Sequence, residues 1–105
     1  MKLEAGKTRV GVVMLTWNQR QMTLEGLASL RELNVPQPRV VLVDNGSTDE
    51  TVEAVAREFP EVHCLRLLLN QGFCAANNRG AEILLKDPAI DCILFVNNDI
   101  EIDPP

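Results

Sequence analysis

The chain has 105 residues, of which 46% are hydrophobic and 24% are charged, and its formal net charge is −5. This is the composition of an ordinary folded domain, which excludes disordered and fibrous proteins, and the length predicts a single domain over residues 1–105. The acidic balance argues against nucleic-acid binding, because nucleic acids require a basic surface.

Membrane insertion and two common cysteine-based sites are also disfavoured. No segment approaches the roughly 18 apolar residues of a membrane span, and the N-terminus lacks the apolar run of a secretory signal, so we expect a cytoplasmic protein. Cys64, Cys74 and Cys92 show no C-x-x-C spacing and are accompanied by a single histidine, His63. The sequence therefore predicts neither a zinc site nor a disulfide framework.

Apolar runs that alternate with amphipathic segments predict the secondary structure. Strands are expected over residues 9–15, 40–43, 62–69 and 92–96. The first is apolar enough to be central, and His63 and Arg66 place the third nearer a sheet edge. Helices are expected over 20–33, from about 48 to 59, and over 73–86, the second beginning at a capping box of Ser47 and Glu50. This alternation predicts an α/β fold with a mostly parallel sheet.

A short polar cluster follows each predicted strand. In a parallel sheet the loops that follow the strands lie at one edge, so segments far apart in sequence converge on one crevice. We therefore expect the ligand site there. The clusters are Thr16-Trp17-Asn18, Asp44-Asn45-Gly46-Ser47, Asn70-Gln71-Gly72-Phe73 and Asn97-Asn98-Asp99.

Two of these residues suit recognition of a nucleoside. Asp44, at a strand end, is placed to accept a hydrogen bond from a base N–H or a ribose hydroxyl. Trp17 is the only tryptophan, and in this loop its indole can stack on a nucleobase. The structural alternatives are an ordinary strand-to-helix turn for Asp44-Asn45-Gly46-Ser47 and core packing for Trp17.

The other clusters suit phosphate and metal binding. Asp99 offers a carboxylate to a hard cation that bridges phosphates, although an Asx-rich turn would have the same sequence. The helix that starts at Phe73 offers free backbone N–H groups to a phosphate, while Arg79 is either a phosphate ligand or a solvated helix charge. Neither a G-x-G-x-x-G nor a G-x-x-x-x-G-K-[ST] motif occurs, which argues against dehydrogenase and P-loop functions.

With these motifs assembled, the chain resembles the donor-binding half of family 2 glycosyltransferases, inverting enzymes with a three-layer, Rossmann-like GT-A fold. Residues 12–18 resemble the strand that ends in the family's Thr-Tyr-Asn, and residues 41–49 resemble its VVDNGSTD motif. Residues 70–80 resemble the segment N-x-G-F followed by an asparagine and a glycine. Residues 97–99 stand where the family has D-X-D, in a form similar to the rhamnosyltransferase branch, and Ile100 to Pro104 resemble the tail that follows.

The resemblance implies a binding role for each cluster. Thr16 and Trp17, beside Asn18, would frame the base; Asp44, beside Gly46, would bind the base or ribose; and the segment from Gly72 and Phe73 to Asn78 would line the diphosphate. Asp99, with Asn97 beside it, would hold Mg²⁺ or Mn²⁺ on a UDP-, dTDP- or GDP-linked sugar. The departures from the family pattern are Leu15 for proline, Trp17 for tyrosine and Asn97 for the first aspartate.

The resemblance also implies a truncated enzyme. The family's catalytic base is a carboxylate downstream of D-X-D, so no catalytic residue is assigned and no turnover is expected from this chain alone. A glycan or lipid-linked acceptor would bind through a C-terminal half, and the full-length protein would be cytoplasmic or peripheral to the membrane. Without that half, self-association of the chain is one expectation.

Two other functions are alternatives at this stage. A sugar-1-phosphate nucleotidyltransferase is disfavoured, because it would need a glycine-rich loop where Thr16-Trp17-Asn18 stands. A noncatalytic receiver-like or interaction module of α/β fold would bind Mg²⁺ at its strand ends, accept phosphate on an aspartate and ignore nucleotides.

Overall fold

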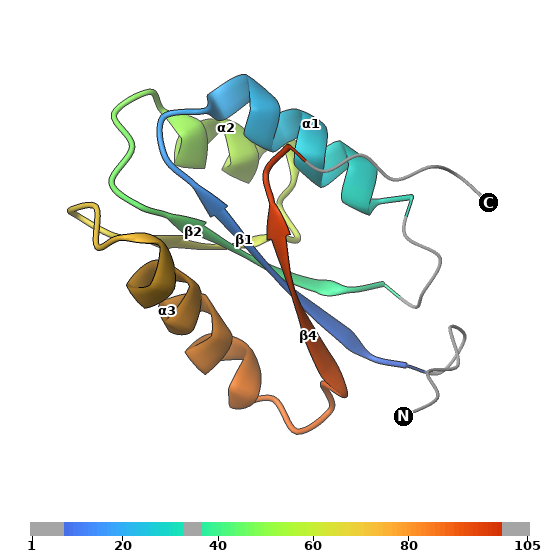
Figure 1. The fold of residues 1–105 in the computed structure, drawn as a ribbon. Helices are drawn as coiled ribbons and strands as arrows, with labels where there is room; N and C mark the ends of the chain where they lie inside the picture. The colour runs from blue at the N-terminus through green and yellow to red at the C-terminus, as the bar shows by residue number, and fades with distance from the viewer. Residues whose placement is uncertain (1–7, 33–36, 100–105) are drawn as a thin grey trace.

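Four parallel strands with helices on both faces make up the part of the chain that the computed structural model describes, residues 8–32 and 37–99 (Figure 1). The α/β class predicted from the sequence is confirmed. In chain order the elements are β1 (Val10–Thr16), α1 (Arg20–Leu30), β2 (Arg39–Asp44), α2 (Thr51–Glu58), β3 (His63–Arg66), α3 (Phe73–Leu85) and β4 (Cys92–Asn97).

The strand order is β3-β2-β1-β4, which puts β1 inside the sheet and β3 at one edge, as the sequence predicts. All three pairings are parallel. The register aligns the last residues of the strands, because Thr16 lies opposite Asp44 and Leu15 lies opposite Asn97. The carboxyl ends of β1, β2 and β4 therefore reach one edge of the sheet together.

The core consists of two apolar layers, one on each face of the sheet. Successive side chains of a strand point to opposite faces, so Val12 belongs to the layer under α1 and α2 while Val13 belongs to the layer under α3. Both valines are fully buried. The continuous apolar sequence of β1 thus follows from its burial between two helical layers.

Close packing of α3 on the sheet depends on a glycine. A Cβ added at Gly80 would lie 2.7 Å from Cγ1 of Val13 and 2.8 Å from Cγ2 of Val43. These distances are shorter than ordinary van der Waals contacts, so the backbone of α3 lies directly on β1 and β2 at this point.

Helix α2 begins later than the sequence pattern predicts, at Thr51 instead of near residue 48, and the predicted capping box is wrong. Glu50 has a left-handed backbone with φ of 62°, and its side chain makes no cap hydrogen bond. The Ser47 hydroxyl is occupied elsewhere, since it accepts a hydrogen bond from the backbone N–H of Asn18 at 2.8 Å. A long-range contact has replaced the local one.

Asp49 caps two helices instead. Its carboxylate accepts hydrogen bonds from the backbone N–H of Thr51 at 3.3 Å and of Arg20 at 3.0 Å, and from the Thr51 hydroxyl. Burial by itself would raise the pKa of the Asp49 carboxyl, but these hydrogen bonds outweigh burial and hold the pKa below its ordinary value of 3.8. One carboxylate thus joins the starts of α1 and α2.

Two other element ends differ from the prediction. Strand β3 ends at Arg66 instead of residue 69, because its partner β2 ends at Asp44, which lies opposite Arg66, and the following Leu68 and Leu69 are exposed. Helix α1 ends at Leu30 instead of Leu33, and Leu33 lies outside the described residues, as does the predicted tail from Ile100 to Pro104. None of the described helices is long and apolar enough to span a bilayer.

The Gly80 contact predicts an unusual response to a helix-favouring substitution. Alanine normally stabilises a helix interior over glycine by about 1 kcal/mol. Gly80→Ala should instead lower the free energy of unfolding by about 1–3 kcal/mol, because the new methyl overpacks against two core valines. Urea unfolding of the variant beside Glu82→Ala, an exposed position of α3, measures this. Stabilisation by Gly80→Ala would contradict the packing.

The lowered pKa of Asp49 predicts a pH-dependent contribution to stability. Because the folded pKa lies below the unfolded one, the contribution is complete at neutral pH. It fades as the pH falls through 3.8 and then through the lower folded pKa. Asp49→Asn should cost about 1 kcal/mol at neutral pH, because an amide NH₂ cannot replace the carboxylate oxygen that accepts from Arg20 or Thr51, and progressively less in acid. Urea unfolding from neutral pH to about pH 3, with Glu82→Gln as the charge-matched control, tests this; a pH-independent difference would refute it.

Candidate functional site

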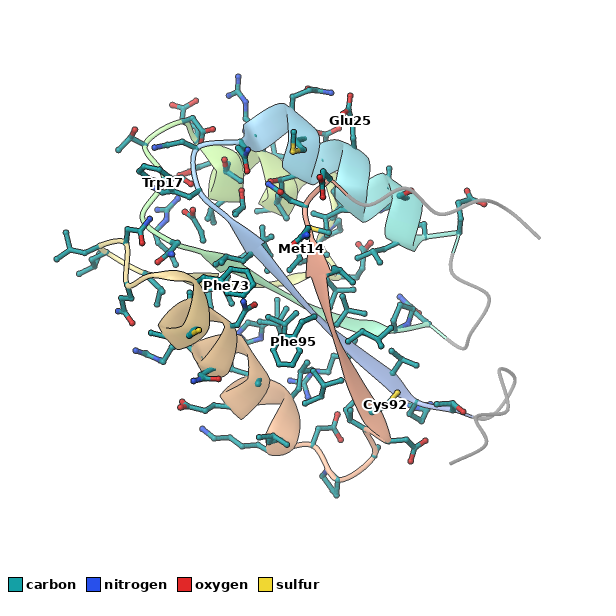
Figure 2. All side chains as sticks on the ribbon, viewed as in Figure 1. Met14, Trp17, Glu25, Phe73, Cys92 and Phe95 are labelled. Carbon is teal, nitrogen blue, oxygen red and sulfur yellow. The ribbon has the colours of Figure 1, made fainter. Side chains whose placement is uncertain are left out.

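The polar clusters come together at the carboxyl edge of the sheet, as the sequence predicts. Figure 2 shows Trp17, after β1, and Phe73, at the start of α3, toward the same end of the molecule, whereas Cys92 at the start of β4 lies at the other. Trp17 is 53% exposed and Phe73 is 62% exposed. Core packing of Trp17, the structural alternative, is therefore excluded, and both rings are accessible at this edge.

Asn18 and the segment Ser47-Thr48 lock the loop after β1 to the loop after β2. Asn18 adopts the left-handed backbone with φ of 51°, a conformation that asparagine tolerates better than most residues. Its N–H donates to the Ser47 hydroxyl at 2.8 Å, and its side-chain oxygen accepts from the backbone N–H of Thr48, also at 2.8 Å. Asn18 therefore fixes the loop geometry.

Asp44 closes β2 in a buried position, with 1% of its surface exposed. Its carboxylate accepts a hydrogen bond from the backbone N–H of Ser47, three residues on, at 3.1 Å, which holds the loop after β2 against the end of the strand. Thr16 lies opposite Asp44 in the register and is buried as well. The Thr16 hydroxyl is 2.7 Å from that of Thr23 on α1, so a hydrogen bond between the two side chains ties the end of β1 to α1.

Asn45, which the sequence analysis assigned to a cluster but not to the site, ties the loop after β2 to the loop before α3. Its side-chain NH₂ donates to the Asn70 side-chain oxygen at 3.1 Å, and its own oxygen accepts from the backbone N–H of Gln71 at 2.8 Å. Asn45 is buried. The only sequence signal for this role is an amide side chain next to a strand end.

The two glycines of the predicted site are required for different reasons. Gly46 has φ of +91°, and a Cβ there would lie 3.1 Å from the backbone nitrogen of Asn70, so both conformation and close approach favour glycine. Gly72 has φ of +85° but open space around it. Gly72 is therefore needed for the turn into α3, whereas Gly46 also lets two loops touch.

The remaining predicted ligands, Asn78, Asn97 and Asp99, are exposed. Over residues 8–32 and 37–99, no group of three or more His, Cys, Asp or Glu side chains is arranged to hold a metal ion. An exposed carboxylate at Asp99 with an amide oxygen at Asn97 nevertheless fits a cation that takes one or two protein ligands and completes its shell with substrate phosphates and water. The ligand roles of all the predicted site residues remain predictions.

The described surface has hollows both beside this edge and away from it. One, of about 280 Å³, opens beside Gly46, Ser47 and Thr48 and is bounded by Arg66, which pairs with Glu53 at 2.6 Å. Another, of about 230 Å³, lies at the opposite end of the sheet and is lined by core side chains such as Leu27 and Phe59 together with the charged Arg31 and Glu61. Only the first adjoins the polar clusters.

Solved structures share this fold. A mannosyltransferase of Pyrobaculum calidifontis, solved with GDP-Man and Mn²⁺, superposes with a TM-score of 0.74 at 24% identity over 90% of this chain and 28% of that one. TarS 1-349 of S. aureus in complex with UDP-GlcNAc superposes with a TM-score of 0.70 at 29% identity over 88% of this chain and 27% of that one. This chain thus spans little more than a quarter of either of these two chains, and 17% of the chain in another structure of S. aureus TarS.

The sequence profile of glycosyl transferase family 2 matches residues 11–105. No curated protein sequence matches the chain. The profile match and the structural neighbours confirm the resemblance and the GT-A fold. With its four polar clusters at one sheet edge and a profile match over nearly its whole length, the chain belongs to glycosyl transferase family 2.

Proposed function

We propose that this chain is the donor-binding half of an inverting glycosyltransferase and that it binds a nucleoside diphosphate sugar with a divalent metal. The observation that carries the proposal is the convergence of the clusters after β1, β2 and β4 and before α3 on one edge, in a chain whose family is established. A glycosyltransferase domain is a better account of this arrangement than a receiver-like module.

The loops after β1 and β2 supply the nucleoside side of the proposed site. TarS, at 29% identity, is seen in complex with UDP-GlcNAc, which supports a nucleotide sugar as the ligand class. The exposed indole of Trp17 offers a stacking surface, and the buried carboxylate of Asp44 offers an acceptor held in place by Ser47. A ligand that lacks the matching donor would add no hydrogen bond to this carboxylate, which provides selectivity.

The start of α3 and the turn after β4 supply the diphosphate side. Gly72 and Phe73 present the backbone N–H groups of a helix start, and Asn78 lies exposed in the same helix. Asp99 and Asn97 would hold Mg²⁺ or Mn²⁺, which when bound would neutralise charge on the departing nucleoside diphosphate. We infer from the asparagine in this motif that the protein is of the rhamnosyltransferase type.

We propose that the acceptor binds to a part of the protein downstream of these residues. The base that deprotonates an acceptor hydroxyl is a downstream carboxylate in the family pattern, and we propose a glycan or lipid-linked acceptor. The residues described here bind and orient the donor. We therefore expect the 105-residue chain to bind nucleotides without transferring sugar.

The proposal predicts metal-dependent nucleotide binding. Calorimetric titration of the chain with UDP, dTDP and GDP should give saturable binding of at least one of them, tighter with Mn²⁺ than without it. Asp99→Ala should abolish the benefit of Mn²⁺ and leave metal-free binding unchanged, because the carboxylate acts on the ligand through the cation.

Asp91→Ala is the matched control for that titration, since it removes an exposed carboxylate at the opposite end of β4 and should retain the Mn²⁺ benefit. A loss of the Mn²⁺ benefit in both variants would point to a general effect of charge. Absence of binding of all three nucleotides to the wild-type chain would refute the proposed function for these residues.

The position of Trp17 predicts a change in tryptophan fluorescence when a nucleotide binds. Because it is the only tryptophan and half of its surface is exposed, stacking of a nucleobase should quench the intrinsic fluorescence of the chain. Trp17→Ala should weaken nucleotide binding by about 1–3 kcal/mol, and Trp17→Phe by less, since a ring remains. Equal affinities of all three proteins would show that the indole does not contact the base.

A further inference from the structure

A row of buried polar side chains runs from β1 through α1 to the turn after β4. Thr23, on α1, is fully buried and stands between the two strand ends. Its hydroxyl is 2.7 Å from that of Thr16 and accepts a hydrogen bond from the side-chain NH₂ of Asn98 at 3.3 Å. The same NH₂ donates to the side-chain oxygen of Gln19 at 2.9 Å.

The helix also touches the backbone of this turn. A Cβ added at Gly26, one turn after Thr23, would lie 2.5 Å from the Asn98 carbonyl oxygen and 3.2 Å from the carbonyl carbon. Only a residue without a side chain permits that approach. Asn98 is therefore held on α1 both by its amide group and by direct backbone contact.

The three residues at the end of β4 differ in exposure because only the middle one is anchored on α1. Asn98 has 8% of its surface exposed, whereas Asn97 and Asp99 on either side of it are exposed. Burying an amide without partners is costly, so the hydrogen bonds to Gln19 and Thr23 specify the inward direction of Asn98. With the middle residue fixed inward, its neighbours are presented outward at the edge of the sheet.

We propose that Asn98, Thr23 and Gln19 are positioning residues that seat the turn after β4 on α1 and so fix where Asp99 presents its carboxylate. The inference rests on the proposed function, since it concerns the metal-dependent part of nucleotide binding. Side chains that orient a metal-ligating residue without contacting the ion commonly change metal affinity when they are substituted. The Thr23 hydroxyl also lies within hydrogen-bond distance of the Thr16 hydroxyl, which anchors the same helix to the end of β1.

The measured quantity is the Mn²⁺ benefit, defined as the ratio of the nucleotide dissociation constant without Mn²⁺ to that with it. Thr23→Val, which keeps the shape of the side chain and removes its hydroxyl, and Asn98→Ala should each reduce this ratio about 10-fold. Metal-free affinity should stay within about twofold, because the remainder of the site is intact. Thr23→Ser, which restores the hydroxyl, should restore the ratio.

Gly26→Ala tests the backbone contact independently and should reduce the same ratio by displacing the Asn98 carbonyl. Gly11→Ala is its matched control. There a new Cβ would meet Cδ1 of Leu84, the end of a flexible side chain, at 2.8 Å and far from the turn, so the Mn²⁺ benefit should be retained. Circular dichroism and the urea midpoint of each variant give its folded fraction under the titration conditions.

The outcomes separate the two proposals. If the wild-type chain shows the Mn²⁺ benefit and Thr23→Val, Asn98→Ala and Gly26→Ala all retain it, the positioning role is refuted and the proposed function stands. If Gly11→Ala loses the benefit as fully as the others, the effect follows stability and the positioning role is again refuted. A wild-type chain that shows no Mn²⁺ benefit would refute the metal part of the proposed function, and the positioning role with it.

Discussion

Parallel pairing in a fixed register is the constraint on which the rest of the molecule depends. Because Thr16, Asp44 and Asn97 end neighbouring strands at nearly the same level, the segments that follow must leave the sheet side by side. The register in turn is held by apolar burial on both faces, since a slip of one residue would exchange the two core layers. The position of the polar edge is therefore decided by valines and leucines that never contact a ligand.

Above that edge, polar side chains divide between holding loops and facing solvent. The side-chain oxygens of Asn18, Asn45 and Asp49 accept hydrogen bonds from backbone N–H groups of neighbouring segments. Trp17 and Asp99, in contrast, are exposed. Such a division is expected where a ligand must meet a preorganised surface, because loops that are already ordered lose little entropy on binding. Many of the asparagines of this chain are thus structural parts of the site.

The sequence predicts the fold well because its signals are local. Continuous apolar runs place β1, β2 and β4, and a weaker, interrupted run places β3. The prediction that β1 is interior and β3 lies at an edge is confirmed, and the clusters share one edge as expected. The capping box failed because the Ser47 hydroxyl bonds Asn18, which is 29 residues away and whose approach no local pattern reveals. The roles of Asn45 and Thr23 were missed for the same reason, since an amide or hydroxyl in sequence carries no mark of its distant partner.

The two edge strands of the sheet differ in how readily each could pair with a further strand. Strand β3 is short and ends in Arg66, which pairs with Glu53 of α2 and leaves a charged, irregular border. Strand β4 is longer, and its Leu94 and Phe95 side chains are exposed. Charged and short borders resist pairing, whereas a regular apolar border accepts it. The β4 edge is therefore the one at which this sheet can accept a further strand.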